Sequence, residues 1–287
     1  MFITAAAGIA AYIQKGKDVS AETRKKLVYS LYEDDPWRKL DKPEPGDWLY
    51  SFNESGQTLD EYKSEATNKK TPSRFRIYLL PLGEIKREKG EILENMLEYS
   101  EIFLGCEIKI LDPKPLPAKT YNESRKQYNA NGILDAIMPS VPKDALALAA
   151  ITTEDLYVPD LNFVFGVASL TSRVGVYSLA RYGFGDANKK KFLRRSVNVM
   201  AHEMGHIFGM NHCIFYDCIM CGSNSLAETD RRSSLLCPLC IDKLEWCLGF
   251  DIMERYEKLE SFYREHGLDE ETEAVKNRIQ YLRNKIK

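Results

Sequence analysis

The segment HEMGHIFGMNHC constrains this chain more than any other and holds three of its four histidines. Side chains four residues apart lie on one face of a helix, so His202 and His206 can reach the same metal ion, with Glu203 beside them. Gly209 can end that helix in the left-handed conformation, after which the chain can bring His212 back toward the same ion. The segment therefore predicts a helix, a sharp turn and a three-histidine metal site.

Three protein ligands leave one coordination position for water. A zinc site of this open kind lowers the pKa of its bound water to about 7 and can polarise a carbonyl, which is the chemistry of a metallopeptidase. Glu203 is the candidate base. The short HExxH core also occurs on ordinary helices, so the extension through Gly209 to His212 carries most of the prediction.

Four cysteines follow the histidines as two close pairs. Four residues separate Cys213 from Cys218, two separate Cys237 from Cys240, and eighteen lie between the pairs. Four thiolates give closed tetrahedral coordination without a water position, so this zinc is expected to stabilise the fold. The spacing and the odd total of seven cysteines favour this site, and a reducing compartment such as the cytoplasm or nucleus, over two disulfides or free buried thiols.

His212 and Cys213 are neighbours, yet we assign them to different ions. Successive side chains of an extended segment point to opposite faces, so neighbours can serve two separate sites. The competing assignment makes Cys213 the third ligand of the histidine site, but it leaves the cysteine site one ligand short. Two zinc ions per chain are therefore expected, one catalytic and one structural.

These motifs resemble those of the archaemetzincins, a branch of the metzincin zinc peptidases. The resemblance rests on HEMGHIFGMNHC, on CIM at residues 218–220, on CPLC at residues 237–240, on LNFVFGVAS at residues 161–169 and on DRR at residues 230–232. It implies a metzincin-like α/β (α+β) fold, with a twisted mixed sheet, a backing helix, an active-site helix and a small C-terminal subdomain around a four-cysteine zinc site.

The resemblance also implies a role for each motif residue. Glu203 would be the general base and acid, and Met220 the Met-turn methionine beneath the first site. The implied ligands are His202, His206 and His212 for the catalytic zinc, and Cys213, Cys218, Cys237 and Cys240 for the structural zinc.

Two features depart from the family pattern. Cys221 follows Met220 and brings a fifth thiol near both metals, where it could replace a ligand or oxidise. The basic run at residues 189–195 lies where some relatives have a longer insertion, and we interpret it as a solvated loop rather than an anion site.

Hydrophobic patterning predicts the order of elements. Residues 145–152 are almost continuously apolar and predict a central strand, and one of the strands at 162–169 and 174–180 should form a sheet edge that binds extended peptide. The other expected elements are strands at 75–82 and 107–111 and helices at 88–104, ended by Gly105, at 127–138 and at 196–208, capped by Ser196.

Three segments are expected. Residues 1–72 form an N-terminal extension, helical and partly flexible, residues 73–212 the subdomain with the active-site helix, and residues 213–287 the C-terminal subdomain. Within the extension, the apolar residues 1–13 lack the basic region of a secretory signal and predict a packed helix, whereas the polar residues 51–70 predict a linker.

The C-terminal helix carries apolar residues at regular spacing. We expect this side to pack on the core, with pairing to a partner helix as the alternative. The residues concerned are Val275, Ile279, Leu282 and Ile286.

Charge and hydropathy restrict the partners. A formal net charge of −2 gives no attraction to nucleic acid or an anionic membrane, and no apolar run approaches the roughly eighteen residues that span a bilayer. The metallopeptidase motif makes a peptide or an unstructured protein the expected substrate. The sequence does not specify an oligomeric state.

The leading functional prediction is a zinc metallopeptidase. Aminopeptidase-like action on short peptides, which the resemblance suggests for some family members, needs an acidic group for the substrate's amino terminus, and Glu154, Asp155 and Asp160 are candidates or merely solvated loop residues. The alternative is a non-catalytic, zinc-stabilised protein-binding module. Glu203 argues against that alternative, because a purely structural histidine site needs no carboxylate.

Overall fold

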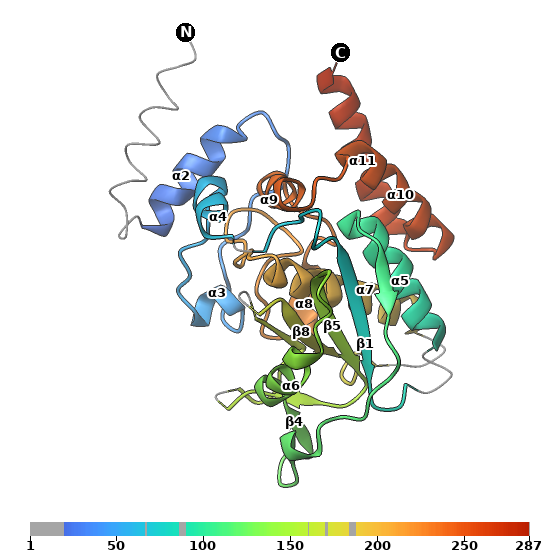
Figure 1. Ribbon diagram of the computed structural model, residues 1–287. Helices are drawn as coiled ribbons and strands as arrows, with labels where there is room; N and C mark the ends of the chain where they lie inside the picture. The colour runs from blue at the N-terminus through green and yellow to red at the C-terminus, as the bar shows by residue number, and fades with distance from the viewer. Residues whose placement is uncertain are drawn as a thin grey trace.

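The computed structural model describes residues 20–66, 68–85, 90–159, 161–169, 172–183 and 188–286. The predicted helix at residues 1–13 lies outside them. A five-stranded sheet occupies the centre of the molecule, with α5 (Gly90–Leu104) and α7 (Lys189–Ile207) packed on one face and α6 (Ala130–Ile137) on the other (Figure 1).

The order of strands in the sheet is β2-β1-β5-β8-β7. β7 runs antiparallel to β8, and the other neighbouring strands are parallel. The prediction that residues 145–152 form a central strand is confirmed, because every residue of β5 is buried. β7, not β8, is the edge strand. The strands are β1 (Arg76–Leu82), β2 (Ile108–Ile110), β5 (Ala145–Thr152), β7 (Gly166–Ser169) and β8 (Val174–Ser178).

Successive side chains of β1 point to opposite faces of the sheet, so this strand contributes to the hydrophobic cores on both faces. Ile77 and Leu79 pack into the core shared with α5 and α7, whereas Tyr78 and Leu80 pack into the core that contains α6. The helix predicted at residues 127–138 is shorter, because residues 127–129 form a strand of a second, small sheet. That sheet consists of β3 (Tyr121–Asn122), β4 (Gln127–Asn129) and β6 (Leu156–Tyr157).

The start of α7 corrects two predictions. The helix begins at Lys189, so Ser196 is an interior residue, and its hydroxyl donates to the carbonyl of Phe192 at 2.8 Å. The basic run at residues 189–195 is therefore helical and not a solvated loop. Arg195 pairs with Asp230 of α8 (Leu226–Arg231) at 2.6 Å, so partners that are distant in sequence neutralise part of this positive helix start.

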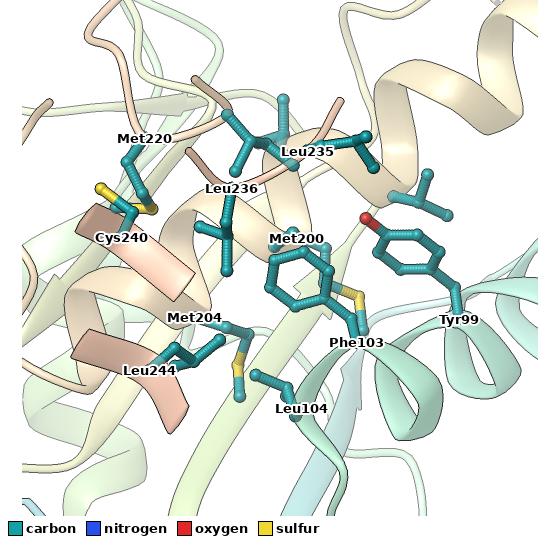
Figure 2. Packing of buried hydrophobic residues seen from close by; sticks show 14 of the residues in the cluster. Tyr99, Phe103, Leu104, Met200, Met204, Met220, Leu235, Leu236, Cys240 and Leu244 are labelled. Carbon is teal, nitrogen blue, oxygen red and sulfur yellow. The ribbon is translucent and has the colours of Figure 1, made fainter. Parts of the chain in front are cut away.

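The inner half of α7 is buried between α5 and the C-terminal region. Figure 2 shows Met200 and Met204 of α7 close to Phe103 and Leu104 of α5, with Leu236 on another side of the same cluster. This packing fixes the helix that carries the first two histidines.

Three helices complete the C-terminal region, and α10 lies against both α5 and α11 (Figure 1). Val275 and Ile279 are buried in the main core, which confirms that the last helix packs on the core. None of the helices in the described part of the chain is long and apolar enough to cross a bilayer. The three helices are α9 (Pro238–Leu248), α10 (Ile252–Glu265) and α11 (Asp269–Ile286).

The described part of the N-terminal segment, residues 20–66 and 68–72, packs on the rest of the molecule. Residues 51–70, predicted as a linker, instead contain α4, whose start is stabilised by a reciprocal capping box between Thr58 and Glu61. Tyr62 is fully buried, and its hydroxyl donates to the carbonyl of Phe208 at 2.9 Å. The division of the chain into three segments stays a prediction. The helices of this region are α2 (Ala21–Leu31), α3 (Trp48–Ser51) and α4 (Leu59–Glu65).

Candidate metal centre

Three histidines converge at the end of α7. His202 and His206 lie one turn apart on this helix, and their Nε2 atoms are 3.0 Å apart. His212 joins them from the following segment, so that one ring nitrogen from each histidine lies within 4.8 Å of the others. The structure therefore brings together all three residues that the spacing singles out.

The turn that returns His212 depends on Gly209. Its φ of +85° lies in the left-handed region, where residues with a Cβ are strained. Its backbone N–H donates to the carbonyl of His206 at 2.9 Å, and that of Met210 donates to Gly205 at 3.0 Å, which closes the end of α7. The residues after this turn then place His212 beside the helix.

Each histidine has an acceptor for its Nδ1 atom. The carbonyls of Ile219 and Met210 lie 2.9 Å from His202 Nδ1 and 2.6 Å from His206 Nδ1, and Oε1 of Glu54 lies 2.7 Å from His212 Nδ1. With the ring protons on Nδ1, all three Nε2 lone pairs are available to one ion. This donor set fits an open zinc site.

Desolvation keeps the imidazoles of His202 and His206, the two histidines on α7, neutral. It lowers the pKa of His202 well below its usual range, with further contributions from His206 and His212. Desolvation, followed by repulsion from His212, lowers the pKa of His206 to about 4. Neutral imidazole is the form that binds metal, so burial keeps these two side chains in the form that can bind an ion.

Glu203 belongs to the histidine helix α7, and its side chain faces the edge strand β7. It is 8% exposed, and burial raises the pKa of its carboxyl group to about 8. β7 crosses directly against it, because a Cβ added to Gly166 would lie 2.6 Å from the Glu203 carboxyl carbon. A nearby cation would favour the ionised form of this carboxyl group.

Four cysteines form a second, closed group. Their sulfur atoms lie within 4.8 Å of one another, and the side chains of Cys213, Cys218, Cys237 and Cys240 are 0–2% exposed. The sulfurs of Cys213 and Cys237 are 3.8 Å apart. Tetrahedral coordination with Zn–S bonds of about 2.3 Å gives S–S separations of about 3.8 Å, so the group fits zinc and not disulfides.

Backbone N–H groups support these thiolates. Those of Met220 and Cys237 donate to the sulfur of Cys218 at 3.5 and 3.3 Å. Cys237 and Cys240 lie at the N-terminus of α9, where the helix dipole favours negative charge. Cys221 lies outside the group, and its thiol donates to the carbonyl of Tyr216 at 3.3 Å.

Met220 connects the two centres. Its carbonyl accepts from the backbone N–H of Cys213 at 2.8 Å. Its side chain packs against α7 between the two helical histidines, because a Cβ on Gly205 would overlap the Met220 sulfur. Met220 therefore lies beneath the histidine site, where the family resemblance places the Met-turn residue.

A cleft of about 510 Å³ contains the histidines and Glu203. Residues 165–168, which include most of the edge strand, line it. Glu154 and Asp155, the candidate amino-terminus receptors, do not, and Asp155 pairs with Arg181 at 2.6 Å. Asp160 lies outside the described residues.

Two site residues were missed by the sequence analysis. Trp48 lines the cleft with its ring edge-on to His212, and Glu54 accepts the hydrogen bond from that histidine. Both belong to the N-terminal segment, to which no function was assigned. No pattern in the sequence marks them, because their partners lie more than 150 residues away along the chain.

Comparisons with known proteins identify similar chains. Residues 106–246 match the model of Peptidase family M54. Archaemetzincin-2 from Macaca fascicularis is 34% identical over 256 residues, which cover 75% of this chain and 71% of the relative. Archaemetzincin from Pyrococcus furiosus is 35% identical over 184 residues, which cover 61% of this chain and 95% of the relative.

Two solved structures are also similar. Archaemetzincin from Methanopyrus kandleri superimposes with a TM-score of 0.54 at 33% identity, over 63% of this chain and 99% of the other. Archaemetzincin from Archaeoglobus fulgidus complexed with malonate gives a TM-score of 0.52 at 30% identity, over 58% of this chain and 99% of the other.

Proposed function

This chain belongs to the archaemetzincin family of zinc metallopeptidases, as its motifs predicted, and we propose that His202, His206 and His212 bind the catalytic zinc while Glu203 transfers protons during peptide hydrolysis. The observation that carries this assignment is the convergence of three imidazoles beside a carboxylate in one cleft. A zinc ion on these ligands supplies Lewis acidity, which activates water and polarises the scissile carbonyl.

Glu203 is the proton-transfer group. Its ionised carboxylate would take a proton from the attacking water and deliver it to the leaving amine. Its environment suits both steps, since burial raises the carboxyl pKa to about 8 and a cation at the histidines lowers it again. The close approach of Gly166 holds the carboxylate in the cleft.

The edge strand is the proposed binding surface for substrate. β7 has a sheet neighbour on only one side, and residues 165–168 line the cleft beside Glu203. An extended peptide can add to this edge through backbone hydrogen bonds, which provide affinity with little dependence on sequence. Short or unstructured peptides meet this requirement.

The cleft lining bears on the choice between exopeptidase and endopeptidase action. Glu203 is the only carboxylate among the described residues that line the cleft. A receptor for a free amino terminus would be a second carboxylate, so we propose that cleavage does not require a free amino terminus. Matched peptides with free and acetylated N-termini should be cleaved at rates within about tenfold of each other, whereas an aminopeptidase cleaves only the free form.

The Glu203→Gln substitution tests the assignment. The variant should retain zinc at the histidines and lose at least about 10²–10⁴-fold in turnover of a peptide library, because it cannot accept the proton. Glu154→Gln is the matched control, since it changes an exposed residue outside the cleft and should leave turnover unchanged.

Wild-type turnover in Glu203→Gln would refute the proposed role. Two bound zinc ions without cleavage of any library peptide would favour the zinc-stabilised binding module instead.

A further inference from the structure

The orienting partner of His212 comes from the N-terminal segment. Glu54 lies 158 residues before His212 and outside the residues matched by the family model, yet its Oε1 atom lies 2.7 Å from Nδ1 of that histidine. The corresponding partners of His202 and His206 are backbone carbonyls within 17 residues of each histidine. Among the described residues, His212 is the only one of the three histidines whose Nδ1 atom has a charged side chain as its partner.

The carboxylate of Glu54 is itself held in place. The indole N–H of Trp48 donates to the same oxygen at 2.9 Å, and the backbone N–H of Trp48 donates to both carboxylate oxygens of Glu228 at 3.1 Å. Glu228 is 1% exposed, so this chain of contacts is anchored in the interior. Glu54 therefore has one defined position beside the His212 ring.

The same segment also fixes the backbone before His212. The side-chain amide of Gln57 donates to the carbonyl of Gly209 at 3.2 Å, and its oxygen accepts from the backbone N–H of Asn211 at 3.3 Å. Lys243 in turn donates to the Gln57 carbonyl at 2.6 Å. Residues 54–57 thus support both the ring of the third histidine and the turn that brings it to the site.

Stability alone does not account for a carboxylate at this position. The second oxygen of Glu54, Oε2, is buried and has no hydrogen-bond partner among the described residues. A buried, unpaired carboxylate oxygen is unfavourable unless a positive charge lies nearby. Three converging imidazole nitrogens that can bind a divalent cation would supply that charge.

We propose that Glu54 is a positioning residue for the metal centre, and that the N-terminal segment thereby completes the histidine site. The carboxylate would hold the His212 proton on Nδ1, point Nε2 at the ion and strengthen this ligand. The inference rests on the proposed assignment of the histidines as metal ligands, but it concerns zinc affinity and not the reaction.

The test measures the zinc dissociation constant of the histidine site in the full chain by competition with a chromophoric chelator. Glu54→Ala should weaken zinc binding at this site about 10–100-fold, because partners that orient metal ligands have effects of this size. Glu54→Gln should lie between Glu54→Ala and wild type, since its amide oxygen can still accept from His212. The variant His206→Ala identifies which of the two zinc ions belongs to the histidines.

Asp60→Asn is the matched control. Asp60 is an exposed residue of α4 in the same segment, so this substitution removes the same charge without touching the histidines, and affinity should stay within about twofold of wild type. Retention of the cysteine-bound zinc shows that each variant is folded. If Glu54→Ala loses the cysteine-bound zinc, the test uses Glu54→Gln instead, and the zinc affinity of its histidine site is compared with that of wild type and of Asp60→Asn.

Two results would overturn the inference. One is a folded Glu54→Ala or Glu54→Gln variant whose zinc affinity matches that of wild type, and the other is an equal loss of affinity in Asp60→Asn. Failure of the proposed function is distinguishable from either result. In that case wild type would bind two zinc ions and cleave no peptide. The zinc affinities of the Glu54 variants relative to wild type would still test the role of Glu54.

Discussion

The two candidate metal centres meet at adjacent residues, His212 and Cys213, but they differ in exposure. The histidines are partly exposed on the floor of a cleft, whereas the four cysteine side chains are 0–2% exposed. An open site admits water and substrate, and a closed site admits neither. The difference in burial therefore separates a centre suited to chemistry from one suited to stability.

The centres also differ in what supports them. The cysteine group uses its own neighbourhood, since all four thiols and the N–H groups that donate to Cys218 lie within residues 213–240. The histidine group draws on Ile219, Met210 and the distant Glu54. The closed centre is therefore formed by residues that are near one another in sequence. The side chains of the open centre are oriented in part by a residue from a distant part of the chain.

The largest expected effect comes from removing a thiol of the closed centre. Cys240→Ser should abolish tetrahedral thiolate coordination and lower the free energy of unfolding by about 4–5 kcal/mol or more, because loss of a structural metal is among the most destabilising changes. The chain should lose its structural zinc and unfold at a much lower temperature. Thermal unfolding and zinc content of the purified protein measure both effects.

His206→Ala provides the contrast. The helix that carries His206 is fixed by its own core packing, so this variant should keep the cysteine-bound zinc and lose less thermal stability than Cys240→Ser. If both variants lose the same stability, the division into a chemical and a structural centre is wrong.

An intermediate effect is expected from Gly205→Ala, which tests the link between the centres. The added Cβ would overlap the Met220 sulfur, so the free energy of unfolding should fall by about 1–3 kcal/mol. Without this contact, helix propensity predicts the opposite sign, a gain of about 1 kcal/mol. Denaturant unfolding determines the sign.

A Met220→Ala background provides the control for this substitution. Removing the methionine side chain frees the space, so Gly205→Ala should lower the free energy of unfolding less in this background than in wild type. The same cost in both backgrounds would mean that Met220 does not restrict residue 205.

The smallest effect is expected at Cys221, one of the thiols outside both centres. Cys221→Ser keeps a donor for the Tyr216 carbonyl, so the free energy of unfolding should change by about 1 kcal/mol or less, with both zinc ions retained. Metal analysis after gel filtration is the measurement. Loss of one zinc ion would show that Cys221 is a ligand and that the group of four is misassigned.

Local patterns predicted the parts of the molecule that depend on near neighbours in sequence. The spacing of His202 and His206 is a property of helix geometry, and the glycine turn after them uses conformational freedom that belongs to Gly209 itself. β5 could be predicted as a central strand because burial on both faces requires a continuous apolar run.

Other features could not be predicted because their causes are distant in sequence. Helix α7 starts at Lys189, where positive charges would be unfavourable without the acidic partners that tertiary packing supplies, among them Asp230. Residues 51–70 look like a linker by composition, yet they pack because a buried tyrosine and asparagine find carbonyl acceptors on other elements.

By itself the sequence predicted which residues are candidate ligands for two metal ions, since ligand type and spacing are local properties. Only the tertiary structure decided that β7 is the open edge beside Glu203 and that Glu54 orients His212. The physical reason is that a hydrogen bond across 158 residues leaves no periodic signal in the chain. It exists only after folding has brought the two side chains together.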